Sequence, residues 1–113
     1  MHEISLLESV LETLEDQARQ QNFSQVKQIT LEIGALSCVA VDALRFGFDV
    51  VMKNTLAENA ELLITEVAGQ GRCAKCQQLV ELETLHDPCS HCGAFGVTVT
   101  QGEQMRIKEL KVI

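Results

Sequence analysis

The sequence predicts an α+β fold, in which two helices pack on a small three-stranded mixed sheet and a small cysteine-rich module is inserted between strands. Three observations lead to this prediction. Two stretches repeat their apolar residues at helical spacing, and others alternate them as strands do. Four of the five cysteines fall in one short segment that also holds most of the glycines and the only proline. Apolar residues make up 46% of the 113 residues, which is typical of a globular chain.

The first helix is predicted over residues 4–21, and the first strand follows it closely. Apolar residues recur every three or four positions in the helical segment, with charged residues between them, as on one face of an amphipathic helix. They are Leu7, Val10, Leu11, Leu14 and Ala18. Over residues 26–34, Ile29, Leu31 and Ile33 share one face of an alternating pattern that indicates a strand.

Helical spacing returns over residues 41–53, and two further strands are predicted after it. The apolar face of this second helix consists of Val41, Leu44, Phe48 and Val51. Gly47 within it costs about 1 kcal/mol relative to alanine, which suggests that another element packs closely there. Residues 60–67 read as a strand, and the alternation over residues 103–113 indicates a strand that returns to the first sheet.

Residues 69–100 differ in composition from the rest of the chain. They are expected to form a separate small domain, with short strands at 79–83 and 97–99. The smaller domain would then be inserted into an α/β domain that consists of residues 1–68 and 101–113.

The four clustered cysteines form two CxxC pairs, Cys73 with Cys76 and Cys89 with Cys92, separated by twelve residues. This doubled spacing predicts a closed, structural Zn(II) site of four thiolates in a zinc-ribbon-like module. A module this small has little core, so metal binding would supply much of its stability. An iron–sulfur cluster uses the same ligands, and a redox-switch disulfide is a further alternative. A thioredoxin-type motif is disfavoured because neither pair lies between a strand and a helix.

The remaining cysteine and two of the histidines have ordinary explanations. Cys38 stands alone in the sequence and is expected to pack as a small buried hydrophobe. His86 and His91 lie in or beside the second CxxC pair and are expected to be solvated loop residues. His91 as a substitute ligand for a cysteine remains an alternative.

The charge and the first residues limit the function classes. The net charge of −7 argues against a general nucleic-acid binder. No apolar run approaches the length of a membrane span, and the acidic start does not resemble a secretory signal. A cytoplasmic location is therefore expected, where structural disulfides are rare.

The chain begins Met1-His2-Glu3. Because His2 is bulky, Met1 is expected to be retained. The Met1 amine, the His2 amide nitrogen and the His2 imidazole can close adjacent chelate rings on one metal, with the Glu3 amide nitrogen as a further donor nearby. Nitrogen donors in a plane favour Ni(II) or Cu(II) over zinc. Spacing alone makes this a weak indication, since most chains that begin in this way bind no metal there.

Taken together, these features resemble the HypA/HybF family, the nickel-delivery proteins of [NiFe]-hydrogenase maturation. The resemblance runs along essentially the whole chain and includes the segments MHEISL, LEIGALSCV, LRFGFDVV and QGEQMRIKEL and the paired CxxC module. The combination of an amino-terminal Met-His-Glu with two late CxxC pairs is specific, whereas neither feature alone would be.

The resemblance implies a non-enzymatic metallochaperone that carries Ni(II) as cargo and holds structural Zn(II). It implies that His2 is the essential nickel ligand, helped by Met1 and supported by Glu3, in the α/β domain. It also implies that Cys73, Cys76, Cys89 and Cys92 hold zinc in the smaller domain. The implied partners are a HypB-type GTPase, the precursor of the hydrogenase large subunit and, in some members, urease maturation proteins; a homodimer is also considered.

Two other functions remain alternatives at this point. One is a zinc-ribbon interaction adaptor that binds no nickel. The other is a redox sensor that uses the CxxC pairs. Nickel binding by the amino terminus and bound zinc in the isolated protein would distinguish the three functions.

Overall fold

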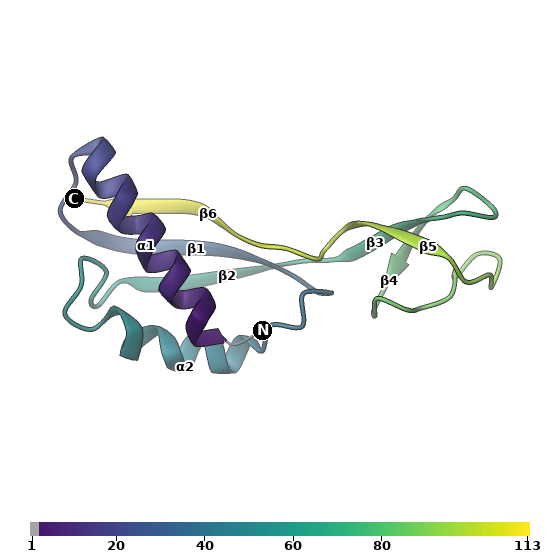
Figure 1. Ribbon diagram of the computed structural model, residues 1–113, viewed down its shortest axis with the longest axis horizontal. Helices are drawn as coiled ribbons and strands as arrows, with labels where there is room; N and C mark the ends of the chain where they lie inside the picture. The colour runs from purple at the N-terminus through teal and green to yellow at the C-terminus, as the bar shows by residue number, and fades with distance from the viewer. Residues whose placement is uncertain (1–2) are drawn as a thin grey trace. The chain divides into compact units, whose positions relative to one another are not determined.

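The computed structural model describes residues 3–113, and within that range it contains two helices and six strands (Figure 1). In chain order these are α1 (Glu3–Gln21), β1 (Val26–Gly34), α2 (Val41–Met52), β2 (Glu61–Val67), β3 (Gly69–Cys73), β4 (Leu79–Leu82), β5 (Val97–Gln101) and β6 (Met105–Val112). The strands form two sheets, with the orders β2-β1-β6 and β4-β3-β5. The predicted α+β class, with two helices on a three-stranded sheet, is confirmed.

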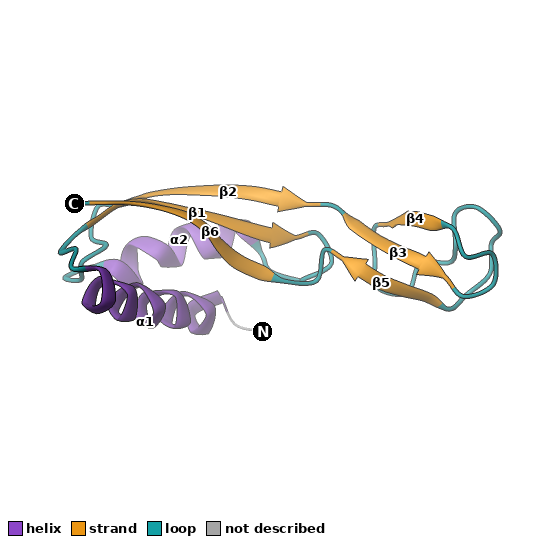
Figure 2. Cartoon of the chain, turned by 90° about the horizontal axis from the view of Figure 1, so that it is seen from above, coloured by secondary structure: helices purple, strands orange, loops and turns teal. Residues whose placement is uncertain are grey.

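The sheet β2-β1-β6 is mixed. β6 runs antiparallel to β1, because the amide of Ser24 donates to the carbonyl of Ile113 before β1, and the amide of Gly34 donates to the carbonyl of Gln104 at its end. β2 runs in the same direction as β1 (Figure 2). Both helices cover the same face of this sheet. The strand predicted at the end of the chain therefore does return to the first sheet.

The helices and β1 share an aliphatic core. Leu7 and Leu14 of α1, Ile29 and Leu31 of β1 and Leu44 of α2 are all fully buried. Each such side chain contributes about 1.5–3 kcal/mol through its removal from water. The apolar faces inferred from the 3.6-residue and two-residue periods are the faces that the fold buries.

Gly47 lies where α2 packs closely against α1. A Cβ atom at this position would lie 2.7 Å from Cδ1 of Ile4 and 3.2 Å from Cδ1 of Leu7. The residue is buried within α2. The close packing predicted from a glycine inside a helix is confirmed.

The sheet β4-β3-β5 is antiparallel throughout. Gly69 to Arg72 of β3 pair with Leu82 to Leu79 of β4, and β3 pairs on its other edge with β5, where the register shifts between Gln70 and Gly71. β3 was not predicted from the sequence, because its two glycines and its arginine give it no strand pattern. Here the close approach of β5 requires glycine, since a Cβ at Gly71 would lie 2.5 Å from Cγ1 of Val97.

The chain divides into two compact units. The first unit consists of residues 1–31, 39–64 and 107–113, and the second consists of residues 32–38 and 65–106. The second unit has its own small core, formed by Leu36, Val80 and Leu82 with two cysteines, Cys73 and Cys89.

Cys38 is exposed, so its expected burial as a small hydrophobe is wrong. β1 ends at Gly34, so its alternation does not extend to Cys38, which lies in the connection to α2 with a left-handed φ of 61°. Within residues 3–113, no helix combines the length and the apolar character needed to cross a bilayer.

Candidate metal centre

The four sulfur atoms of the two CxxC pairs converge in the second unit. All four lie within 4.8 Å of one another. The Sγ atoms of Cys73 and Cys92 are 3.6 Å apart, and those of Cys76 and Cys89 are 3.7 Å apart. Each close contact therefore joins one CxxC pair to the other.

These separations fit a single tetrahedral ion. With metal–sulfur bonds of about 2.3 Å, the edge of a tetrahedron of sulfurs is about 3.8 Å. In a multi-iron cluster each thiolate binds a different iron atom, so the sulfurs would have to stand farther apart than one coordination sphere allows. All four cysteines are free thiols, with no disulfide among them. The arrangement favours one thiolate-bound ion over a cluster or a disulfide switch.

Backbone amides point at two of the sulfurs. The amides of Lys75 and Cys76 donate to Sγ of Cys73 at 3.4 and 3.5 Å. The amides of His91 and Cys92 donate to Sγ of Cys89 at 3.3 and 3.4 Å. Such donors stabilise a negative charge on sulfur, so the first cysteine of each pair is prepared to act as a thiolate ligand.

The two CxxC turns have the same backbone structure. In the first, the amide of Gln77 donates to the carbonyl of Cys73, and the amide of Cys73 donates to Gln78. In the second, Gly93 donates to Cys89, and Cys89 donates to Ala94 in the same way. The residue after each second cysteine is left-handed, with φ of 63° at Gln77 and 78° at Gly93.

The thiol pKa values differ between the ligands. The amide of Cys76, helped by that of Lys75, lowers the pKa of Cys73 to about 6 against the opposing effect of burial. The pKa of Cys89 is also lowered, first by the amide of Cys92. For Cys76, the amide of Gln78 lowers the pKa, but burial and the neighbouring sulfurs outweigh it and raise the value to about 11. A bound cation must therefore displace a proton from Cys76.

The cysteines and the histidines near them differ in their exposure to solvent. Cys73 is fully buried at the end of β3, and Cys89 is almost fully buried beside it, whereas Cys92 is exposed. His86 and His91 are both exposed, in agreement with their expected place in solvated loops.

Asp87, between these two histidines in the sequence, accepts hydrogen bonds from the Thr84 hydroxyl and from the amides of Thr84 and Glu83. The hydroxyl and the amides lower the pKa of this carboxyl group.

Of the predicted nickel ligands, Glu3 is the one that the structure describes; Met1 and His2 lie outside the described residues. Glu3 is the first residue of α1. Its Oε2 accepts a hydrogen bond of 3.2 Å from the amide of Ala40, which directly precedes α2. The carboxylate thus joins the beginnings of the two helices, and its negative charge is favourable at the amino-terminal end of α2.

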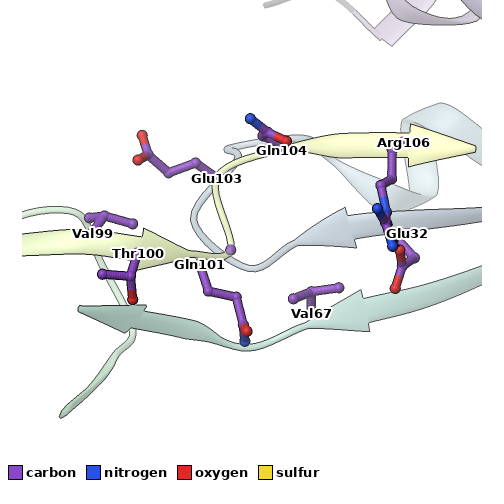
Figure 3. A pocket seen from close by; sticks show the side chains of 9 residues that line it. Glu32, Val67, Val99, Thr100, Gln101, Glu103, Gln104 and Arg106 are labelled. Atoms are coloured by element: carbon purple, nitrogen blue, oxygen red, sulfur yellow. Dashed lines mark hydrogen bonds and ion pairs between the residues drawn. The ribbon is translucent and has the colours of Figure 1, made fainter. Parts of the chain in front are cut away.

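A cleft of about 510 Å³ lies in the second unit and was not predicted from the sequence (Figure 3). Its wall includes the ion pair of Arg106 with Glu32, together with Gln101, Glu103 and Gln104. Its residues come from the ends of strands far apart in sequence, so no local motif could have indicated it.

Comparison with known proteins gives the same family along the whole chain. The family described as hydrogenase/urease nickel incorporation, metallochaperone, HypA matches residues 1–112. The hydrogenase maturation factor HypA of Bradyrhizobium sp. (strain ORS 278) is 48% identical over 112 residues, which cover 99% of each chain. The protein of the same name from Azorhizobium caulinodans is 46% identical over 113 residues and the full length of both chains.

Solved structures show the same fold. The solution structure of the Ni metallochaperone HypA from Helicobacter pylori superimposes with a TM-score of 0.75 at 23% identity, covering 100% of this chain and 98% of that one. A second solution structure of a HypA protein gives a TM-score of 0.72 at 22% identity. With the full-length family match and relatives above 40% identity, the chain belongs to the HypA family of nickel-incorporation metallochaperones, which are maturation factors and not enzymes.

Proposed function

We propose that this protein binds Ni(II) at its amino terminus and delivers it for insertion into the large subunit of [NiFe]-hydrogenase, while a structural Zn(II) ion holds its second unit together. Nickel is the cargo in this function, and zinc is resident. The observation that carries the proposal is that Glu3 begins α1 and is bonded to the amide of Ala40. A nickel site built from the two preceding residues and Glu3 would thus be attached to a fixed point of the fold.

The proposed nickel ligands are the Met1 amine, the His2 amide nitrogen and the His2 imidazole, with Glu3 completing or supporting the site. The hydrogen bond to Ala40 supports a positioning role for the Glu3 carboxylate. A site made mostly from a chain end suits a carrier, which must release its metal.

The proposed zinc ligands are Cys73, Cys76, Cys89 and Cys92. The sulfur separations of 3.6 and 3.7 Å and the amide donors to Cys73 and Cys89 support this assignment. Zinc bound by four protein ligands would have no open position, so it would crosslink the two CxxC turns rather than catalyse a reaction.

The remaining proposals follow from family membership. We assign residues 1–68 and 101–113 to a nickel-binding domain and residues 69–100 to a zinc-binding domain. The proposed partners are a HypB-type GTPase and the large-subunit precursor, with urease maturation proteins and a homodimer as further candidates. The proposed location is the cytoplasm, where the thiols would remain reduced.

The nickel site is tested by comparing the native protein with His2→Ala and with a variant extended by four residues at the amino terminus. A one-residue extension is avoided because it would place the histidine third and create a new planar nickel chelate of the amine, two amide nitrogens and the imidazole. Zinc-loaded samples are titrated with Ni(II) and followed by calorimetry and by absorption spectroscopy. The native protein should bind one nickel ion, and both variants should lose most of that affinity, because each removes one nitrogen donor. Equal binding by all three would refute the proposal.

The metal content of the protein as isolated separates this function from the two alternatives. Bound zinc with no affinity for nickel would favour an interaction adaptor. Reversible loss of free thiols under mild oxidants, with no bound zinc, would favour a redox sensor. Zinc retained through oxidation, together with nickel bound at the amino terminus, supports the proposed function.

A further inference from the structure

The first turn of α1 is attached to α2 at two points, both within the first unit (Figure 1). At the first, the carboxylate of Glu3 accepts a hydrogen bond of 3.2 Å from the amide of Ala40, the residue that directly precedes α2. At the second, the side chain of Ile4 lies against Gly47, where a Cβ atom would be 2.7 Å from Cδ1 of Ile4. We call these two contacts the α1 anchor.

The beginning of α2 depends on α1 for its side-chain cap. Ala40 occupies the N-cap position, and its carbonyl accepts a hydrogen bond from the amide of Leu44. Alanine has no side-chain acceptor, so this residue cannot cap the helix in the usual way. The Glu3 carboxylate reaches the Ala40 amide from the other helix, as a glutamate does within a capping box. The same hydrogen bond therefore holds the beginnings of both helices.

The residues that carry the proposed nickel donors, Met1 and His2, directly precede Glu3 in the sequence. A flexible chain end loses conformational freedom when it closes chelate rings on a metal, and this loss lowers the affinity for the metal. A chain end that starts from a fixed residue has less freedom to lose. Contacts that fix Glu3 can therefore raise the nickel affinity without contributing a donor atom.

We propose, on the basis of the amino-terminal nickel site proposed above, that Ala40 and Gly47 of α2 are positioning residues for nickel. Ala40 acts through the carboxylate of Glu3, and Gly47 acts through the side chain of Ile4. In this role Glu3 supplies an oxygen that accepts a hydrogen bond from α2, and this oxygen is not a ligand of the metal. The nickel site is then supported by two residues of α2 that lie far from it in the sequence.

Ala40→Pro tests the first contact, because it removes the amide hydrogen and leaves the carbonyl in place. The φ of Ala40 is −80°, which is within the range of proline. Zinc-loaded, full-length protein is titrated with Ni(II) and followed by calorimetry. The variant should bind nickel about three- to tenfold more weakly than the native protein, as expected for the loss of one hydrogen bond. Ala40→Gly keeps the amide hydrogen, is tolerated at an N-cap, and should bind within about twofold of the native protein.

Two substitutions of Glu3 distinguish positioning from metal ligation. Glu3→Ala removes the acceptor and should weaken nickel binding about as much as Ala40→Pro. Glu3→Gln keeps a side-chain oxygen that can accept the Ala40 amide, so it should restore most of the affinity that Glu3→Ala loses. The double variant of Glu3→Ala with Ala40→Pro should bind no more weakly than either single variant, because both remove the same hydrogen bond. The absorption bands of the nickel-saturated protein should be the same in all of these variants, since no donor atom changes.

Ile4→Ala tests the second contact by removing most of the side chain that lies against Gly47. It should weaken nickel binding by about two- to fivefold, because less apolar contact holds the first turn of α1 on α2. Ile113→Ala is the matched control. Ile113 is an exposed isoleucine of the same unit, and its amide donates to the carbonyl of Gln25, beyond the other end of α1. This control should bind nickel as the native protein does.

The outcomes separate the positioning role from the nickel site itself. Native affinity in Ala40→Pro, while His2→Ala has lost its nickel binding, would overturn the positioning role and leave the nickel site standing. Loss of affinity in Glu3→Gln together with shifted absorption bands would make Glu3 a ligand instead, and an equal loss in Ile113→Ala and Ile4→Ala would reduce the second contact to general stability. If Ala40→Pro does not fold, equal nickel affinities of Glu3→Ala and Glu3→Gln contradict the proposal. A native protein that binds no nickel refutes the site and the positioning together.

Discussion

At the scale of single residues, Gln77 and Gly93 occupy the same position in the two CxxC turns. Both are left-handed, with φ of 63° and 78°. The left-handed conformation costs a residue with a Cβ atom about 1–2 kcal/mol of free energy, whereas glycine adopts it without this cost. The first turn is therefore strained at a place where the second is not.

The first prediction concerns this pair. Gln77→Gly should stabilise the zinc-bound protein by about 1 kcal/mol, and Gly93→Ala should destabilise it by a similar amount. Thermal unfolding and competition with a zinc chelator measure both effects. A control, Ala74→Gly, changes a turn residue whose φ is not positive, so it should not stabilise. Equal stabilisation by the two glycine substitutions would show that flexibility, rather than the left-handed φ, is responsible.

The second prediction concerns the proton balance of the thiols. Because the pKa of Cys73 is about 6, this ligand is a thiolate at pH 7 and becomes a thiol as the pH falls through 6. Cys76, with a pKa of about 11, is protonated throughout this range before metal binds. The number of protons released per zinc ion should therefore rise as the pH is lowered from 7 towards 5.5.

Calorimetric zinc titrations in buffers of different ionisation enthalpy measure this proton release. Cys38→Ser serves as the control, because Cys38 is not among the clustered sulfurs and its removal should leave the profile unchanged. A change in proton release near pH 9 instead of 6 would mean that the amide donors do not act on Cys73 in the metal-free protein.

At the scale of elements, three glycines lie where the strands leave the first sheet. A Cβ at Gly34 would lie 2.0 Å from the carbonyl oxygen of Gly102, and a Cβ at Gly102 would lie 2.7 Å from Cα of Gly69. Both contacts are with backbone, which cannot move aside as a side chain can. The amide of Leu36 also donates to the Gly102 carbonyl. We call this place, where Gly34, Gly69 and Gly102 lie against one another, the crossing.

The third prediction compares two glycines with different neighbours. Gly34→Ala should destabilise the protein by about 1–3 kcal/mol or more, since overpacking here displaces backbone. Gly47→Ala meets the flexible end of Ile4 and gains about 1 kcal/mol of helix propensity, so its net effect should be within about 1 kcal/mol of zero. Denaturant unfolding measures both variants. A larger loss for Gly47→Ala than for Gly34→Ala would contradict this account of the crossing.

The same elements show what sequence patterns could predict. The bounds predicted for β1 agree with the structure, because its alternating aliphatic residues face a core on one side. The core faces of α1 and α2, the close packing at Gly47 and the four clustered cysteines were also predicted. β3 was missed because its sequence, GQGRC, is set by pairing with β4 and β5 rather than by its own propensity. The hydrogen bond from the Ala40 amide to the Glu3 carboxylate joins residues 37 positions apart, and no local pattern indicates such a contact.

At the scale of the whole molecule, the two units differ in the interactions that stabilise each of them internally. The first unit buries large aliphatic residues from α1, α2 and β1. The buried core of the second unit is Leu36, Val80 and Leu82 with Cys73 and Cys89. Two of its five buried members are thus proposed metal ligands, and burial of three aliphatic side chains gives only about 5–9 kcal/mol. That gain must offset about 1–2 kcal/mol of backbone entropy for each ordered residue.

The fourth prediction is that metal removal unfolds the second unit and leaves the first one folded. After chelation, amides of β3, β4 and β5 should exchange with solvent at least about tenfold faster, while those of α1 and of residues 26–31 in β1 should keep their protection. Hydrogen exchange followed by mass spectrometry measures both sets in one sample, and the helical circular dichroism should persist because both helices belong to the first unit. Restoring zinc should restore protection, whereas Cys89→Ser should show fast exchange with or without zinc. Loss of helix protection in step with β3 would mean that the two cores form one cooperative unit, and unchanged protection everywhere would mean that the small core is sufficient without metal.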